Sequence, residues 1–77
     1  MNQFKAYGYP RNDDSLESPF ELSEVTLNTS PEVLRELAKF LEDAAVQIEN
    51  GAQHIHLQDH WPGWQHGEAD IIAFRRD

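Results

Sequence analysis

Apolar residues between positions 31 and 50 recur at the three- and four-residue spacing that places side chains on one face of an α-helix. One broad apolar stripe forms from Val33, Leu34, Leu37, Phe40, Leu41, Ala44, Ala45 and Ile48. Charged residues fall opposite, at Glu32, Arg35, Glu36, Lys39, Glu42 and Asp43. Ser30 suits an N-cap, Pro31 a first helical position, and Gly51 a helix end. The pattern predicts an amphipathic helix over residues 31–50 whose stripe packs into the core.

Four further segments are predicted to form β-strands, and residues 53–59 show the alternation of polar and apolar residues that is typical of a half-buried strand. The four segments are residues 4–9 and 21–28 before the helix, and residues 53–59 and 69–75 after it. The two longer connecting segments are polar and contain proline or glycine, which favours loops. The predicted order of elements is therefore β-β-α-β-β.

A single α+β domain over residues 1–77 follows from this order and from the short length of the chain. We expect an antiparallel sheet of about four strands, with the long helix packed on one face. The side chains that point towards the helix would be Val25, Leu27, Ile55 and Leu57. The opposite face would carry Tyr7, Tyr9, Thr26, His54 and His56. That face is either a contact surface, since tyrosine is enriched in interfaces, or a half-solvated surface of amphipathic side chains.

Fourteen acidic and six basic side chains give the chain a formal net charge of -8. This charge argues against nucleic-acid binding, because proteins that bind nucleic acids need basic patches to displace counterions. It suits a basic protein partner, since opposite charges steer association. Simple solubility explains an acidic surface as well.

The composition also indicates a cellular location. The sequence contains no cysteine, so neither a disulfide nor a thiolate metal site can stabilise the fold, and a reducing compartment fits. The N-terminus lacks the basic and apolar regions of a signal peptide. No apolar stretch approaches the roughly 20 residues of a membrane-spanning helix. We therefore expect a cytoplasmic protein that does not bind membranes.

Three histidines, His54, His56 and His60, are the clearest candidates for chemistry. A His-x-His pair on a strand directs two imidazoles to one face, and imidazole binds zinc and other transition metals. One hypothesis is a metal site built from these histidines, with carboxylates from residues 59–70 as further ligands; the alternative is a solvated strand surface without a cofactor. The serines lie outside any glycine elbow and no phosphate-binding glycine loop occurs, so the sequence does not indicate an enzyme.

Two tryptophans flank a Pro-Gly turn in the segment DHWPGW, residues 59–64. Exposed tryptophan is a frequent binding hot spot. In a domain with so little apolar volume, Trp61 and Trp64 can equally fold back and close one end of the core. Each tryptophan can also take a different one of these two roles.

Three stretches of the chain resemble the immunity protein 32 family of bacterial polymorphic-toxin systems. They read LSEVTLNTSPEVLRELAKFLEDAA, HIHLQDHWPGW and ADIIAFR, and they cover most of the chain from about Leu22 onward. The resemblance implies a small cytoplasmic protein that binds and neutralises a cognate toxin. It implies no catalytic motif and no particular binding residue.

The sequence therefore supports three hypotheses. The first is a protein-binding module, such as an immunity protein that neutralises a basic toxin. Its contact surface would comprise Trp61, Trp64, His60, Asp13, Asp14, Glu17, Glu21, Glu24, Tyr7 and Tyr9. The second is a domain that binds a metal or small ligand through the histidine cluster. The third is a homodimer whose sheet faces pack together.

Overall fold

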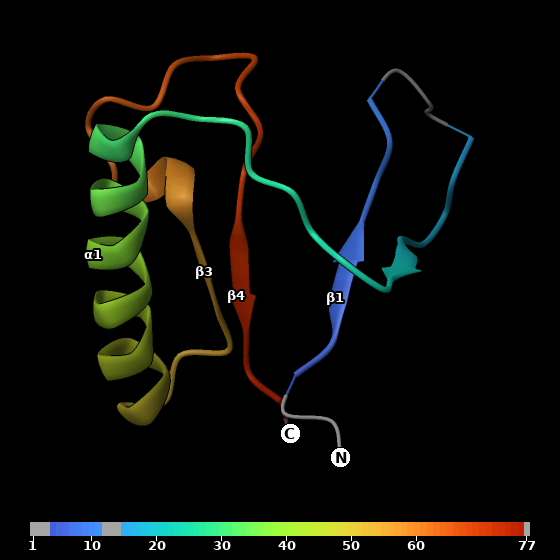
Figure 1. Cartoon of the computed structure of the whole chain (residues 1–77). Helices are drawn as coiled ribbons and strands as arrows, with labels where there is room; N and C mark the ends of the chain where they lie inside the picture. Colours follow the sequence, from blue (N-terminus) through green and yellow to red (C-terminus); the bar gives the residue numbers. More distant parts are fainter. Residues whose placement is uncertain (1–3, 12–14, 77) are drawn as a thin grey trace.

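The computed structural model, which describes residues 4–11 and 15–76, has an α+β fold with the predicted order β-β-α-β-β (Figure 1). Two short strands come first, β1 at Ala6–Gly8 and β2 at Phe20–Leu22. They are followed by the helix α1 at Pro31–Glu49, strand β3 at His54–His56, a 3-10 turn at Leu57–Asp59 and strand β4 at Ile72–Phe74. Within this part of the chain, no helix combines the length and apolar character needed to cross a bilayer.

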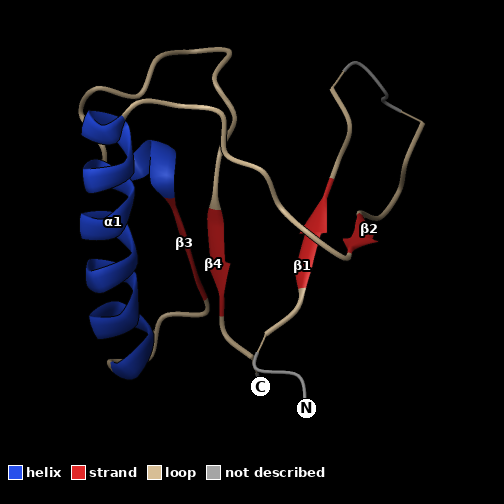
Figure 2. Cartoon of the chain, in the orientation of Figure 1, coloured by secondary structure: helices blue, strands red, loops and turns tan. Residues whose placement is uncertain are grey.

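The strands form two separate antiparallel pairs rather than one sheet of four. β1 pairs with β2, and β3 pairs with β4 so that His54 lies opposite Phe74 and His56 opposite Ile72. Figure 2 shows α1 beside the β3–β4 pair, with the β1–β2 hairpin beyond β4. Tyr7 therefore belongs to a different sheet from the two histidines, and the expected common face of tyrosines and histidines does not form.

The strand predicted over residues 21–28 is much shorter in the structure. β2 ends at Leu22, and residues 24–30 run without regular structure from the hairpin to the start of α1. Val25 and Leu27 are 57% and 50% exposed, so the prediction that they point into the core is wrong. Alternation alone does not make a strand, because the backbone also needs a neighbouring strand for its hydrogen bonds.

The helix begins as its sequence predicts. Ser30 Oγ accepts a hydrogen bond of 3.2 Å from the amide of Val33, which satisfies one of the free donors of the first turn. Pro31 occupies the first helical position, where its missing N–H costs nothing.

The C-terminal end of α1 depends on a residue far along the chain. Gly51 follows the helix with a φ of 109°, a left-handed conformation that glycine adopts without strain. The last turn of α1 contains no basic residue. The guanidinium of Arg75 lies there instead and donates hydrogen bonds to the carbonyl oxygens of Ile48 and Ala52. A positive charge at this position stabilises the helix through its dipole.

The core lies between α1 and the β3–β4 pair. Its buried residues are Leu37, Phe40, Ala44, Ile55 and Leu57. Half-buried apolar residues surround them: Val33, Ile48, Ala52, Trp61, Trp64, Ile71 and Ala73. Ile55 and Leu57 thus pack against the helix as predicted, although Leu57 does so from the 3-10 turn.

The apolar stripe of α1 is only partly covered. Leu34, Leu41 and Ala45 are exposed, so the prediction that the whole stripe is core is wrong for them. The physical reason is that the two-stranded sheet of β3 and β4 is narrower than the apolar stripe. Two strands about 4.8 Å apart cannot enclose a broad stripe on a helix that is about 10 Å across.

Candidate functional site

A groove of about 250 Å³ lies between α1 and the residues that follow the 3-10 turn. We call it the Trp61 groove, and it is lined by Glu36, Lys39, Phe40, Asp43, His60 and Trp61. The four helical residues recur at three- and four-residue spacing, which places them on one side of α1. The amides of His60 and Trp61 both bond to the carbonyl oxygen of Leu57, at 2.9 and 3.0 Å, and this tight turn holds the two residues against the helix.

His60 is held in the groove by hydrogen bonds at both ring nitrogens. Its Nδ1 lies 3.2 Å from the carbonyl oxygen of His56, which can only accept, so Nδ1 carries a proton. In the neutral ring Nε2 is then an acceptor, and it accepts from Nε2 of Gln47 at 2.9 Å. The same Gln47 nitrogen donates to Asp43 Oδ2, also at 2.9 Å. For a neutral ring these contacts assign the Nδ1–H tautomer, and Gln47 connects Asp43 to His60 through hydrogen bonds.

The wall of the Trp61 groove is acidic. Glu36 and Asp43 supply two carboxylates and Lys39 supplies one ammonium group, which leaves one net negative charge when His60 is neutral. Lys39 Nζ lies 3.5 Å from Glu36 Oε1, and both side chains are exposed, so a partner can replace this weak ion pair. Carboxylates beside an indole ring suit the side chain of a lysine or an arginine.

The two tryptophans both pack against the core, but their indole rings make different further contacts. The indole N–H of Trp64 donates to the carbonyl oxygen of Ala69 at 3.0 Å and so closes the loop between them. Trp61 lies against Gly63, where an added Cβ would come within 2.8 Å of the indole nitrogen. Both are half-buried, and Trp61 also lines the groove.

A second polar cluster connects β3 to the segment before β4. Asp70 Oδ2 lies 2.7 Å from Nδ1 of His56, and Oδ1 accepts from the backbone amides of Gln58 and Ile71 at 3.0 Å each. Nδ1 of His56 therefore donates, which leaves Nε2 directed elsewhere. In sequence Asp70 resembles any acidic loop residue, because only the pairing of β3 with β4 brings it to His56.

The three histidines do not converge on one point. His54 and His56 share a strand face, as their spacing predicts, with ring centroids 5.2 Å apart. His54 also stacks on Phe74 across the strand pair, at 5.7 Å. His60 turns towards Gln47 instead, because the 3-10 turn redirects the chain after β3. In the part of the chain that the structure describes, no three His, Asp or Glu side chains gather closely enough to hold a metal ion.

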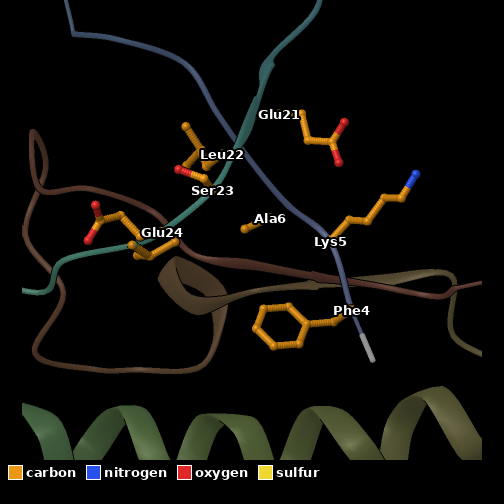
Figure 3. Close-up of a pocket in the computed structure, with 8 residues that line it drawn as sticks. Phe4, Lys5, Ala6, Glu21, Leu22, Ser23 and Glu24 are labelled. Carbon is orange, nitrogen blue, oxygen red and sulfur yellow. The ribbon is translucent and has the colours of Figure 1, made fainter. Parts of the chain in front are cut away.

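A shallow hollow of about 440 Å³ lies on the β1–β2 hairpin (Figure 3). Its lining residues are Phe4, Lys5, Ala6, Glu21, Leu22, Ser23, Glu24 and Val25. In Figure 3, Lys5 and Glu21 extend to one side of the hairpin, while Leu22 and Glu24 lie on the other. Its apolar members Phe4 and Val25 are exposed, so the hollow is open surface rather than a preformed ligand cavity.

The residues predicted to contact a partner fall on two separate surfaces. His60 and Trp61 lie beside α1, where Glu36 and Asp43, which the sequence did not single out, join them. Exposed residues on the other side comprise Tyr7, Tyr9, Glu17, Glu21 and Glu24. Figure 1 shows α1 and the hairpin separated by the β3–β4 pair, so these two groups do not form one continuous patch. Asp13 and Asp14 lie outside the described residues.

Comparison with known proteins bears on the role of these surfaces. Residues 24–76 match the family model described as Immunity protein 32. Searches of curated proteins and of solved structures found no match. The matched segment contains α1, the β3–β4 pair and every residue of the Trp61 groove, and it excludes the β1–β2 hairpin. Because this match extends over more than half of the sequence, the chain belongs to the immunity protein 32 family.

Proposed function

We propose that this protein neutralises a bacterial toxin by binding it directly, and that the Trp61 groove is the centre of the contact surface. One observation carries the choice of surface: the groove is built wholly from residues inside the family-matched segment. Tyr7, Tyr9 and Glu21 lie outside that segment, on the hairpin.

The chemistry of the groove favours a basic segment of the toxin. A lysine or arginine side chain can lie against the indole of Trp61 and meet the carboxylates of Glu36 and Asp43. Tryptophan at the centre of a surface with a charged rim is a common arrangement of binding hot spots. The net charge of -8 steers a basic toxin towards the protein from a distance.

Neutralisation by this route needs no catalysis. A toxin that acts on nucleic acid carries basic residues in its active site, and an acidic partner that covers them blocks the substrate. The protein then acts in the cytoplasm of the cell that produces the toxin, where it meets the toxin first.

The direct test is co-expression with the protein encoded by the neighbouring gene. We expect the two proteins to purify together, and we expect the growth defect caused by the neighbour to disappear. A neighbour that stays toxic and does not co-purify contradicts the proposed function.

A matched pair of double variants tests the choice of surface. Glu36→Lys with Asp43→Lys reverses the charge of the groove, whereas Glu17→Lys with Glu21→Lys changes the net charge equally on the hairpin, outside the family-matched segment. We expect the groove variant to weaken binding at least about tenfold, which corresponds to about 1.4 kcal/mol, and the hairpin variant to bind within a few-fold of the unmodified protein. The reverse ranking would place the contact on the hairpin.

A further inference from the structure

Four exposed residues on α1 form a regular apolar face. They are Leu34, Ala38, Leu41 and Ala45, and none of them is covered by the β3–β4 pair. The two leucines are seven residues apart, and so are the two alanines. At about 100° per residue, all four fall within one narrow sector of the helix surface. We call this sector the heptad face.

We propose that the heptad face pairs with the heptad face of a second copy of the chain, with the two helices antiparallel. In a two-fold arrangement centred between Lys39 and Phe40, position 34 faces position 45 and position 38 faces position 41. Each leucine then meets an alanine of the second copy, along the whole contact. This alternation of large and small side chains lets two helices pack closely.

The charges beside the heptad face select the antiparallel direction. Arg35 and Glu42 border it on its solvent side, and within the described part of the chain neither forms an ion pair. The antiparallel arrangement brings Arg35 close to Glu42 of the second copy, twice by symmetry. A parallel two-fold arrangement would instead place Arg35 of one copy and Glu42 of the other on opposite edges of the contact, so that neither of these ion pairs forms.

The size of the contact predicts a weak dimer. One helix of 19 residues presents a contact smaller than the roughly 800 Å² per partner of a standard stable interface. The like net charge of -8 on both copies opposes association further, although salt near physiological strength screens most of it. Dimerisation should therefore appear at concentrations of about 10 µM to 1 mM.

This pairing leaves the Trp61 groove open. The groove uses Glu36, Lys39 and Asp43, which lie on the opposite flank of α1 from the heptad face. The dimer would present two grooves, and a toxin can bind each of them. The inference does not depend on the proposed function, because self-association is measured without any toxin.

Sedimentation of the full chain at 0.15 M salt, over about 5–500 µM, tests the proposal. We expect the mass to rise from 8.9 kDa towards twice that value across this range. Leu41→Lys should abolish the rise. Val46→Lys is the matched control, since Val46 is 52% exposed, Leu41 is 55% exposed, and the two lie on different sides of α1. Circular dichroism should show both variants folded, because neither side chain is buried.

Cross-linking determines the direction of the helices, because the chain has no cysteine of its own. A mixture of Leu34→Cys and Ala45→Cys chains should form a mixed disulfide under mild oxidation, while either chain alone should not. A disulfide between two Leu34→Cys chains would indicate parallel helices. A disulfide of that kind would overturn the proposal. So would a protein that stays monomeric at every concentration, or equal effects of Leu41→Lys and Val46→Lys on the sedimenting mass. Loss of toxin binding in Leu41→Lys, with the unmodified chain monomeric, would assign the face to the toxin instead.

Discussion

At the scale of single residues, the structure gives different roles to side chains of the same type. His60 is fixed by the backbone of His56 and by Gln47, whereas His56 is fixed by the carboxylate of Asp70. The indole N–H of Trp64 donates a hydrogen bond within its own loop, whereas Trp61 lines the groove. The sequence alone indicated the histidines and tryptophans as candidate functional residues. It could not divide these roles, because each role depends on a neighbour that is brought in by the fold.

Among the exposed and half-buried polar side chains of the β3–β4 pair, we expect removal of Asp70 to lower the free energy of unfolding the most. Asp70→Ala leaves donors of His56 and Gln58 without a partner, so we expect the free energy of unfolding to fall by about 2 kcal/mol. Urea unfolding followed by circular dichroism measures the change. Asp59→Ala on the exposed 3-10 turn is the control and should stay within about 0.5 kcal/mol. Equal losses in both variants would contradict the role given to Asp70.

Zinc binding by the histidines should be weak. His54 and His56 share a face, but His60 turns away from them towards Gln47. Two imidazoles are therefore placed to bind one zinc ion. We expect a dissociation constant weaker than about 0.1 mM, near −5.5 kcal/mol. Calorimetric titration of the full chain with zinc, repeated with His54→Ala, measures it. Tight binding that disappears in the variant would restore the metal hypothesis.

At the scale of elements, the local sequence predicts what lies within one element and not what covers it. Ser30, Pro31 and Gly51 mark the ends of α1, because caps act over three or four residues. The periodicity of the helix also predicts its apolar side. Whether Leu34 and Leu41 are buried depends on the number of strands beside them, which is a non-local property. The same limit explains why residues 24–30 alternate in sequence without forming a strand.

Arg75 connects two elements that are distant in sequence, and its loss should destabilise the helix end. Arg75→Ala removes hydrogen bonds to the carbonyl oxygens of Ile48 and Ala52 together with a favourable charge at the helix C-terminus. We expect a loss of about 1–2 kcal/mol in the free energy of unfolding, partly recovered by Arg75→Lys. Thermal unfolding measures both variants. Lys5→Ala, which removes an exposed cation on the hairpin side, should leave the midpoint unchanged. A midpoint for Arg75→Ala equal to that of Lys5→Ala would show that the end of α1 does not need this cation.

At the scale of the whole molecule, the chain consists of a packed unit and an added hairpin. Among the described residues, all five that form the buried core come from α1, β3 and the 3-10 turn, and the family match begins after β2. Arg11 Nη1 donates a hydrogen bond of 3.0 Å to the carbonyl oxygen of Gly67, which connects the hairpin side to the loop before β4. A prediction of one four-stranded sheet treats the four strands as equivalent. Which strand pairs with which decides that there are two sheets, and the alternation of polar and apolar residues within a strand does not specify its neighbour.

Removal of the hairpin tests this division. Residues 24–77 keep every buried core residue that the structure describes, the hydrogen bonds of Asp70, the contacts of Arg75 and the whole Trp61 groove. We therefore expect this fragment to fold and to keep the helical circular dichroism of the full chain. It should lose less than about 1 kcal/mol of unfolding free energy, since none of the deleted residues that the structure describes is a buried core residue. Because the groove is intact, the fragment should also co-purify with the toxin. A fragment that is unfolded at 25 °C would show that the hairpin contributes to the stability of the unit. A folded fragment that no longer binds would move the contact surface from the groove to the hairpin.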